Sequence, residues 1–273
     1  MKKFKTALTI AGSDPSGGAG LQADLKTFSA LGVYGTTAIV AIVDENTQGV
    51  YGVHPVPETF VAGQIRSVIS DIGADAVKIG MLHSSPLIRT VLSTLREYPE
   101  VTSIVLDPVM VATSGDPLLE PEAVATLRDE LMPYCRVVTP NLPEASMLLG
   151  ETVDSEDQFE DAARALSALA GGKVSVMLKA GHLEGTDTLT DIFYNAETGR
   201  ALRLSSPRVD TRNTHGTGCT LSSAIAAWLA RGADLDTAAA RAKEYISAAA
   251  AAGAAYQTGR GHGPVHHFHG WWE

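Results

Sequence analysis

Residues 213–230 read NTHGTGCTLSSAIAAWLA, a glycine-rich turn that runs directly into an apolar helix. Gly216 and Gly218 let the backbone approach a ligand closely and adopt positive φ angles. The helix that follows offers unpaired backbone N–H groups and the positive end of its dipole. Together these features predict a hole for an anion, of the kind that stabilises a phosphoryl group during its transfer.

Cys219 lies at the start of this predicted helix. A helix N-terminus lowers the pKa of a thiol, so we expect the thiolate of Cys219 to be available as a base. The alternative is a small buried cysteine that packs behind the turn. The local sequence favours the two interpretations equally.

Outward from this stretch, short apolar strands alternate with amphipathic helices. Strands are expected at 7–12, 36–43, 76–79, 103–106, 136–139 and 174–178, a hairpin at 188–194 and 200–205, and helices at 21–31, 57–72, 86–95, 159–169, 217–230 and 235–255. Ser155 and Gln158 form a capping-box pattern before the helix at 159–169. The alternation predicts βαβ units, and hence a three-layer α/β/α fold with a mostly parallel central sheet.

Length and composition limit the class of protein. The 273 residues, with no linker or repeat, predict a single domain over 1–273. The net charge of −10 and the lack of a Lys/Arg cluster argue against nucleic acid and anionic membrane surfaces as partners. Two distant cysteines predict a reducing, cytoplasmic location. The apolar run at 7–12 is too short for a signal peptide, and no run approaches the ~18 residues of a membrane span.

Polar residues follow several of the predicted strands, at the edge where ligands bind in such sheets. They are Gly12-Ser-Asp14, Asp44-Glu45-Asn46, Asp107, Asn141 with Glu144, and Lys179. Carboxylate and amide oxygens suit Mg²⁺, and a lysine can neutralise a transferring phosphate. The alternatives are strand ends that are polar because they reach water, and a helix cap formed by Asn141 and Glu144.

Two further segments are less specific. Gly17-Gly-Ala-Gly20 matches neither a dinucleotide fingerprint nor a Walker A motif, so we interpret it as a turn that lets a substrate lie against the backbone. An oxidoreductase is disfavoured for the same reason. The segment 261–272 carries four histidines; a metal site is open there, but a packed tail is favoured because no Cys or carboxylate accompanies them at ligand spacing.

These motifs resemble a known family. The stretches ALTIAGSDPSGGAG (7–20), QADLKTF (22–28), DPVM (107–110), TPNLPE (139–144), THGTGCT (214–220) and GPVHHF (263–268) are similar to those of the hydroxymethylpyrimidine/phosphomethylpyrimidine kinases, which have the ribokinase-like fold. The resemblance covers essentially the whole chain. It implies that ATP, with Mg²⁺, phosphorylates 4-amino-5-hydroxymethyl-2-methylpyrimidine and then its monophosphate. It also implies a homodimer and leaves a monovalent cation open.

The resemblance implies a role for each motif residue. Cys219 is the base at the pyrimidine hydroxymethyl group, and the backbone beside it completes the anion hole. The implied sets are Gly216, Thr217 and Gly218 for the anion hole; Lys179, Asn213, Thr217 and Gly218 for the nucleotide; Asp107, Glu144 and Asn141 for Mg²⁺; and Gly12, Ala19, Asp24, Glu45, Met81 and Val109 for the pyrimidine pocket.

The chain departs from the family pattern at two informative positions. Glu45 stands where the family has the glutamine that contacts the pyrimidine, and Thr113 stands where a lysine is frequent. A pyridoxal or pyridoxine kinase on the same scaffold is therefore the alternative. A catalytically weak pyrimidine-binding protein is a third hypothesis, against which the intact Gly-Thr-Gly-Cys run argues.

Overall fold

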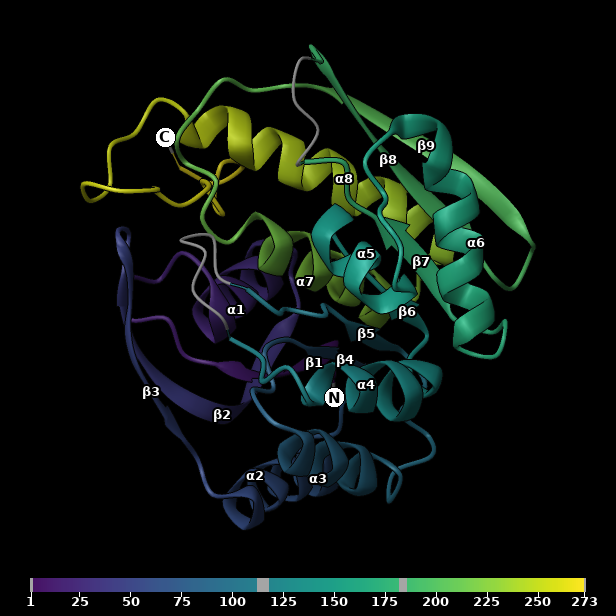
Figure 1. The fold of residues 1–273 in the computed structure, drawn as a ribbon. Coiled ribbons are helices and arrows are strands. Elements are labelled where there is room, and N and C mark those ends of the chain that lie inside the picture. Colours follow the sequence, from purple (N-terminus) through teal and green to yellow (C-terminus); the bar gives the residue numbers. More distant parts are fainter. Residues whose placement is uncertain (1, 112–117, 182–185, 273) are drawn as a thin grey trace.

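A mixed β-sheet forms the middle layer of the computed structural model, which describes residues 2–111, 118–181 and 186–272 (Figure 1). The strands of the described chain are β1 (Thr6–Gly12), β2 (Tyr34–Asn46), β3 (Gly49–Pro55), β4 (Ala76–Ile79), β5 (Ile104–Leu106), β6 (Val137–Val138), β7 (Ser175–Leu178), β8 (Thr188–Asn195) and β9 (Arg200–Pro207). Their order is β3-β2-β1-β4-β5-β6-β7-β8-β9. The six central strands in this order, β2-β1-β4-β5-β6-β7, pair in parallel. At the edges, β3 pairs antiparallel with β2, β8 with β7, and β9 with β8.

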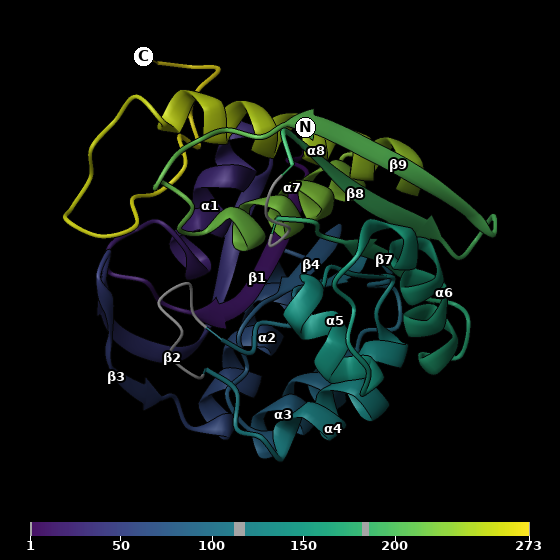
Figure 2. The same cartoon turned by 45° about the horizontal axis from the view of Figure 1, so that its top comes forward.

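Helices cover both faces of this sheet (Figure 2). They are α1 (Gly20–Ala30), α2 (Glu58–Asp71), α3 (Ser85–Leu95), α4 (Ala123–Thr126), α5 (Leu142–Leu149), α6 (Phe159–Leu169), α7 (Thr217–Ala230) and α8 (Leu235–Gly253), with short π and 3₁₀ turns at 127–134 and 156–158. The helices α1, α7 and α8 enclose one hydrophobic core. The helices α2, α3, α5 and α6 enclose the other. The predicted three-layer α/β/α fold is confirmed.

Burial on both faces explains why the central strands are continuous apolar runs. All seven residues of β1 are buried, and so are all four of β4 and of β7. Parallel strands between two helical layers have no solvated face, so their sequences do not alternate. The predicted capping box of Ser155 and Gln158 is confirmed.

Two elements were missed in the sequence. Strand β3 lies at the sheet edge and is largely exposed, and its glycines and its histidine do not form the apolar pattern that marks a strand. The helical turns at 123–134 change from α to π to 3₁₀ geometry, which breaks the 3.6-residue period. Strand β2 also runs three residues beyond the predicted end, so Glu45 lies in it. None of the helices in the described chain is long and apolar enough to cross a membrane.

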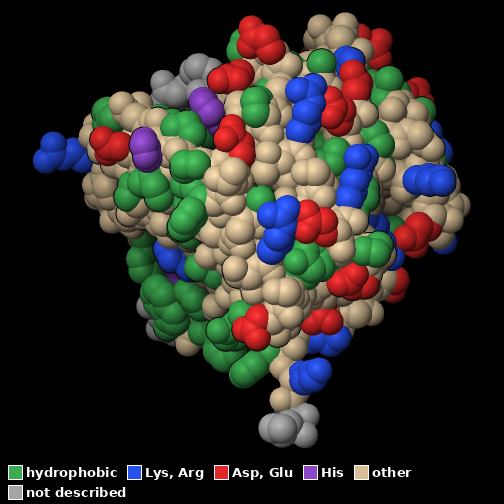
Figure 3. Space-filling model, turned by 90° about the horizontal axis from the view of Figure 1, so that it is seen from below, with side chains coloured by type: hydrophobic (Ala, Val, Ile, Leu, Met, Phe, Trp, Pro, Cys, Tyr) green, Lys and Arg blue, Asp and Glu red, His purple; other side chains and the backbone are tan. Residues whose placement is uncertain are grey.

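Charged side chains of both signs are interspersed on the face drawn in Figure 3, while hydrophobic side chains gather toward one edge of that view. The large exposed hydrophobics include Tyr34 and Ile42 on β2 and Tyr51 on β3.

Candidate active site

A cavity of about 710 Å³ opens at the carboxyl ends of the parallel strands. Its size suits a small-molecule site. The predicted site residues that line it are Gly12, Ala19, Glu45, Met81, Asp107, Val109, Asn141, Glu144, Lys179, Asn213, Gly216, Thr217, Gly218 and Cys219. Residues from across the chain therefore meet at one edge, as the parallel topology predicted. Their individual roles stay predictions.

The glycine-rich turn before α7 is held tightly against the turn after β1. Gly216 has φ +77° and forms the N-cap of α7, with no side-chain cap in the described structure. A Cβ atom at Gly216 would lie 1.8 Å from the carbonyl oxygen of Gly18. No residue other than glycine fits this crossing. The first N–H groups of α7 are thus left without a capping side chain, at a wall of the cavity.

Cys219 is the third residue of α7, and this half-buried residue lines the cavity. Burial raises the pKa of this thiol to about 12, and the ammonium of Lys78 opposes the rise only in part. The prediction that the pKa would be lowered is therefore wrong. Desolvation of the thiolate outweighs the helix N-terminus, so Cys219 is a neutral thiol at neutral pH.

Lys179 and Asp107 form an ion pair across the cavity floor. Lys179 Nζ lies 2.9 Å from Asp107 Oδ1. The hydroxyl groups of Thr139 and Ser222 donate to the two oxygens of the same carboxylate, at 3.1 and 3.3 Å. Burial alone would raise the pKa of Asp107, but Lys179 and Lys78 outweigh it and hold that pKa below its usual value. Asp107 is therefore an anion beside a cation, which is a suitable arrangement for binding phosphate and metal together.

Glu144 and Asn141 form a reciprocal capping box at the start of α5. The Glu144 N–H donates to Asn141 Oδ1 at 2.9 Å, and the Asn141 N–H donates to Glu144 Oε2 at 2.8 Å. The capping role considered for this pair is confirmed. Burial raises the pKa of Glu144 to about 7, although Lys179, 3.9 Å away, opposes the rise. Glu144 can thus ionise readily when a further cation approaches.

The carboxylate of Asp14 organises the turn after β1. Its two oxygens accept the N–H groups of Ser16, Gly18 and Ala19 at 2.7, 2.9 and 2.6 Å. His215 Nε2 lies 2.8 Å from Asp14 Oδ2. Burial alone would raise the pKa of Asp14, but the hydrogen bonds from His215 and Ser16 hold it well below its usual value. Asp14 is an anion throughout the physiological pH range.

Glu45 faces this Asp14–His215 pair from β2. One ligand atom from each of the three side chains lies within 4.8 Å of the other two. Burial raises the pKa of Glu45 to about 7, and the negative charge of Asp14 contributes to the rise, whereas His215 opposes it. Because Asp14 already accepts four donors and stays ionised, Glu45 is the carboxyl group of this cluster that titrates near neutral pH.

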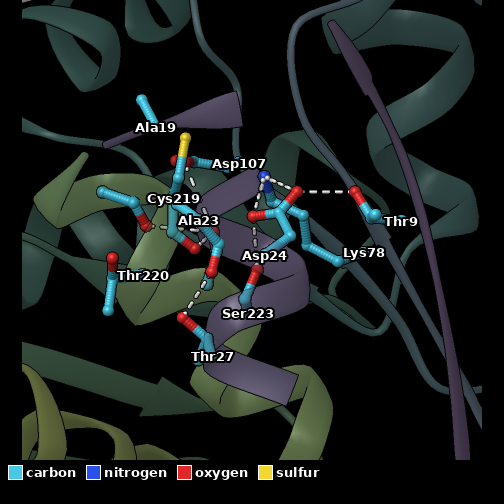
Figure 4. A network of polar contacts seen from close by, with 12 residues as sticks. Thr9, Ala19, Ala23, Asp24, Thr27, Lys78, Asp107, Cys219, Thr220 and Ser223 are labelled. Carbon is cyan, nitrogen blue, oxygen red and sulfur yellow. Dashed lines mark hydrogen bonds and ion pairs between the residues drawn. The ribbon is translucent and has the colours of Figure 1, made fainter. Parts of the chain in front are cut away.

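Asp24 does not line the cavity, which corrects its predicted contact with the substrate. It lies on α1 beneath the floor, fully buried (Figure 4). Thr9 and Ser223 donate to its two oxygens at 2.5 and 2.6 Å. Lys78 Nζ lies 3.0 Å from both of those oxygens. The residue in the cavity lining is Lys78.

A family model matches most of the chain, including the motif that carries Cys219. The phosphomethylpyrimidine kinase model matches residues 14–266. The chain is 50% identical to the hydroxymethylpyrimidine/phosphomethylpyrimidine kinase of Rhizobium meliloti over 98% of both chains. It is 48% identical to the Escherichia coli protein of the same name over the whole of both.

This chain belongs to the phosphomethylpyrimidine kinase family.

Solved structures agree with that membership. A phosphomethylpyrimidine kinase from Clostridium difficile is 40% identical, with a TM-score of 0.76 over 88% of this chain and 97% of that one. The ADP complex of Bacillus subtilis pyridoxal kinase is 39% identical, with a TM-score of 0.87 over 97% and 98%. The predicted family and ribokinase-like fold are confirmed, and the phosphomethylpyrimidine kinase fold extends to pyridoxal kinases.

The sequence reasoning missed two buried lysines in the cavity of this phosphomethylpyrimidine kinase family member. Lys78 interrupts the apolar run of β4, and that interruption was the available signal. Lys243 of α8 pairs with Asp191 of β8 at 2.8 Å, and an alanine-rich helix gave no hint of it. Asp191 also accepts the N–H of Ala180, the residue after Lys179, at 2.8 Å.

The C-terminal histidine segment packs against the glycine-rich turn, where the His215 N–H donates to the carbonyl oxygen of Gly263 at 3.1 Å. Asn213 donates to the carbonyl groups of Gly253 and Tyr256, both at 2.7 Å. His267 Nε2 lies 3.1 Å from the hydroxyl of Thr220 in α7. Burial lowers the pKa of His267 to about 3, so this imidazole is neutral. Thr113, the other departure from the family pattern, lies outside the described residues.

Proposed function

We propose that this chain transfers the γ-phosphoryl group of ATP to the hydroxyl of 4-amino-5-hydroxymethyl-2-methylpyrimidine, and then a second phosphoryl group to the monophosphate, giving the pyrophosphate for thiamine synthesis. One observation carries the proposal: a single cavity unites the uncapped N-terminus of α7, with Cys219, and the Lys179–Asp107–Glu144 group. The relatives named above carry both pyrimidine substrates in their names.

The residues supply what phosphoryl transfer needs, which is positioning and charge neutralisation. The N–H groups at the start of α7 face the negative charge that develops on the transferred group. Lys179 adds a positive charge beside Gly218: a Cβ atom at Gly218 would lie 3.2 Å from Lys179 Nζ. The absence of a side chain there leaves room for a phosphate group next to the ammonium. Cys219 lines the same cavity and, once its thiol has ionised, can take the proton of the attacking hydroxyl.

Mg²⁺ fits the donor set beside the Lys179 ammonium. Asp107 and Glu144 offer carboxylate oxygens, which this cation prefers, and Asn141 offers an amide oxygen beside them. A divalent cation there would favour the ionised form of Glu144, whose pKa of about 7 makes that change inexpensive. When bound, the cation supplies charge neutralisation for the phosphate oxygens.

ATP is the proposed phosphoryl donor because solved structures similar to this chain hold nucleotides. Pyridoxal kinase of Staphylococcus aureus has been solved with ADP and with AMP-PCP, at TM-scores of 0.88 and 0.87. The part of the cavity between Lys179 and the Asp191–Lys243 pair is the proposed nucleotide side.

A coupled assay of ADP release tests the proposal. Turnover is expected with the pyrimidine alcohol and with its monophosphate, each dependent on ATP. Mass spectrometry of the products should detect the monophosphate and then the pyrophosphate. Turnover of neither pyrimidine would refute the proposed function.

Pyridoxal kinase activity is the second candidate, favoured by the overlap with pyridoxal kinases and by Glu45 in place of the usual glutamine. The same assay with pyridoxal and pyridoxine decides between the two, because the preferred ring shows the higher kcat/KM. Binding of the pyrimidine without turnover of any ring would instead support the weak pyrimidine-binding protein.

We further propose a homodimer in the cytoplasm. The apolar side chains of Ile42 on β2 and Tyr51 on β3 are exposed and support self-association, since an exposed apolar patch commonly marks an interface. Light scattering of the purified protein measures the oligomeric state.

A further inference from the structure

Lys78 is a fully buried ammonium in the lining of the active-site cavity. It is the third residue of β4, and its side chain reaches beyond the end of that strand. A Cβ atom at Gly80 would lie 2.9 Å from Lys78 Nζ. The glycine thus leaves the space that the ammonium occupies at the carboxyl edge of the sheet.

The carboxylate of Asp24 has a donor for each oxygen, but the ammonium of Lys78 does not have an acceptor for each of its N–H groups. Asp24 accepts hydrogen bonds from Thr9, Ser223 and Lys78. Among the described residues, Asp24 is the sole hydrogen-bond partner of the Lys78 ammonium group. Both of its oxygens lie 3.0 Å from Nζ, so at least one of the three ammonium N–H donors has no protein acceptor. Buried donors normally have partners, so an acceptor in the cavity is expected to complete this site.

Cys219, like Asp107, responds to the positive charge of Lys78. Ser223, which donates to Asp24, lies one helical turn after Cys219 on α7, so Cys219 is on the face of that helix that contacts the Lys78–Asp24 pair. The ammonium of Lys78 favours the thiolate of Cys219, and the thiolate in turn favours the ammonium. The N–H of Gly20 also favours the thiolate, whereas Asp24 and Asp107 disfavour it.

We propose that Lys78 is a positioning residue for phosphoryl transfer: its buried ammonium is the counter-charge that lets the Cys219 thiol ionise and then take the proton of the substrate hydroxyl. The inference rests on the proposed function. A buried ion pair contributes little net stability compared with apolar side chains, which is consistent with a functional reason for keeping this one.

The proposed step is balanced. The Cys219 thiol first loses its proton to solvent. The substrate oxygen then keeps the electron pair of its O–H bond and forms the new bond to the γ-phosphorus, while the substrate proton passes to the thiolate sulfur of Cys219. The bond from that phosphorus to the bridging oxygen breaks, and its electron pair leaves with ADP. The thiol later releases its proton to solvent. Lys78 keeps all its protons throughout and acts only by charge.

Alkylation of Cys219 by iodoacetamide measures its thiolate directly, without any substrate. Peptide mass spectrometry separates Cys219 from Cys135, whose pKa burial also raises. In Lys78→Met/Asp24→Asn, which removes both charges of the pair together, we expect alkylation at a fixed pH to slow by about threefold to tenfold. In Asp24→Asn alone, the retained ammonium should accelerate alkylation.

The matched control is Lys243→Met/Asp191→Asn, which removes the other buried ion pair of the same cavity. It should leave the alkylation rate of Cys219 within about twofold of wild type. A general loosening of the fold would accelerate alkylation in every variant, whereas the proposal requires opposite changes in the two Asp24 variants. Circular dichroism and thermal unfolding check that each variant is folded.

Equal alkylation rates in wild type and both Asp24 variants, or changes of the same sign in both, would overturn the proposal. In the kinase assay, Lys78→Met/Asp24→Asn should lower kcat and shift the pH profile of kcat to higher pH. The pyrimidine KM should change little. Failure of the proposed function is distinguishable, because the alkylation result does not depend on which ring is phosphorylated.

Discussion

Replacing Glu45 with glutamine should remove the pH dependence of pyrimidine binding. Glu45 is directed toward the ionised Asp14 and has a pKa raised to about 7 by burial and by that charge. Only the neutral acid can donate to a ring nitrogen, because a carboxylate has no donor. The neutral form predominates below about pH 7 and is lost above it, so the wild-type KM for the pyrimidine should increase as the pH rises.

The size of the effect follows from the titration of Glu45. A group with this pKa is roughly 90% neutral at pH 6 and roughly 10% neutral at pH 8. The wild-type KM should therefore increase about tenfold over those two pH units, which corresponds to about 1.4 kcal/mol of binding free energy. Glutamine always carries its donor, so Glu45→Gln should hold KM near its low-pH value across the range. The difference in pH dependence between the two proteins can then be assigned to residue 45, since Asp14 and His215 are unchanged in both.

The assay is initial-rate kinetics with the unphosphorylated pyrimidine alcohol from pH 6 to 9, at saturating ATP and Mg²⁺. The alcohol is preferred because its monophosphate titrates in the same range. The control is Asp44→Asn, which makes the same change of charge at the exposed neighbouring residue and should retain the wild-type pH dependence. A flat wild-type profile, or a steep one that survives in Glu45→Gln, would refute the reasoning. A poor pyrimidine KM at every pH in both proteins, with pyridoxine turnover dominant, would mean that Glu45 does not contact the pyrimidine.

The other predictions concern the transferring group and its cation. Cys219→Ala should lower kcat by about 10²–10⁴ and largely retain pyrimidine affinity, because it removes a base and little volume; near-wild-type turnover would make Cys219 a packing residue. Asp107→Asn and Glu144→Gln should each raise the Mg²⁺ concentration needed for half-maximal rate, and unchanged titration curves would leave Glu144 as a helix cap alone. Gly216→Ala should lower the unfolding free energy by about 1–3 kcal/mol and abolish turnover, since its Cβ would lie 1.8 Å from the Gly18 carbonyl oxygen. Denaturant unfolding measures the first effect, and a stability equal to wild type would contradict it.

Local sequence was sufficient for most of the fold. The wholly buried strand β1 and the capping box of Ser155 and Gln158 are short-range patterns, and each predicted its element. The convergence of Asp107, Asn141 and Lys179 also followed, because parallel strands bring their carboxyl ends to one edge. The edge strand β3 did not follow, since an exposed strand needs no apolar pattern.

The electrostatics of the site depended on tertiary structure. Asp14 meets His215 across 201 residues of sequence, and Asp24 meets Ser223 across 199. These contacts decide that Asp24 lies beneath the cavity while Lys78 lines it. They also reverse the predicted pKa shift of Cys219, because burial depends on what the rest of the chain packs around the thiol. Residue type and spacing predicted which groups meet, but solvent exclusion by distant segments determines which of them carry charge.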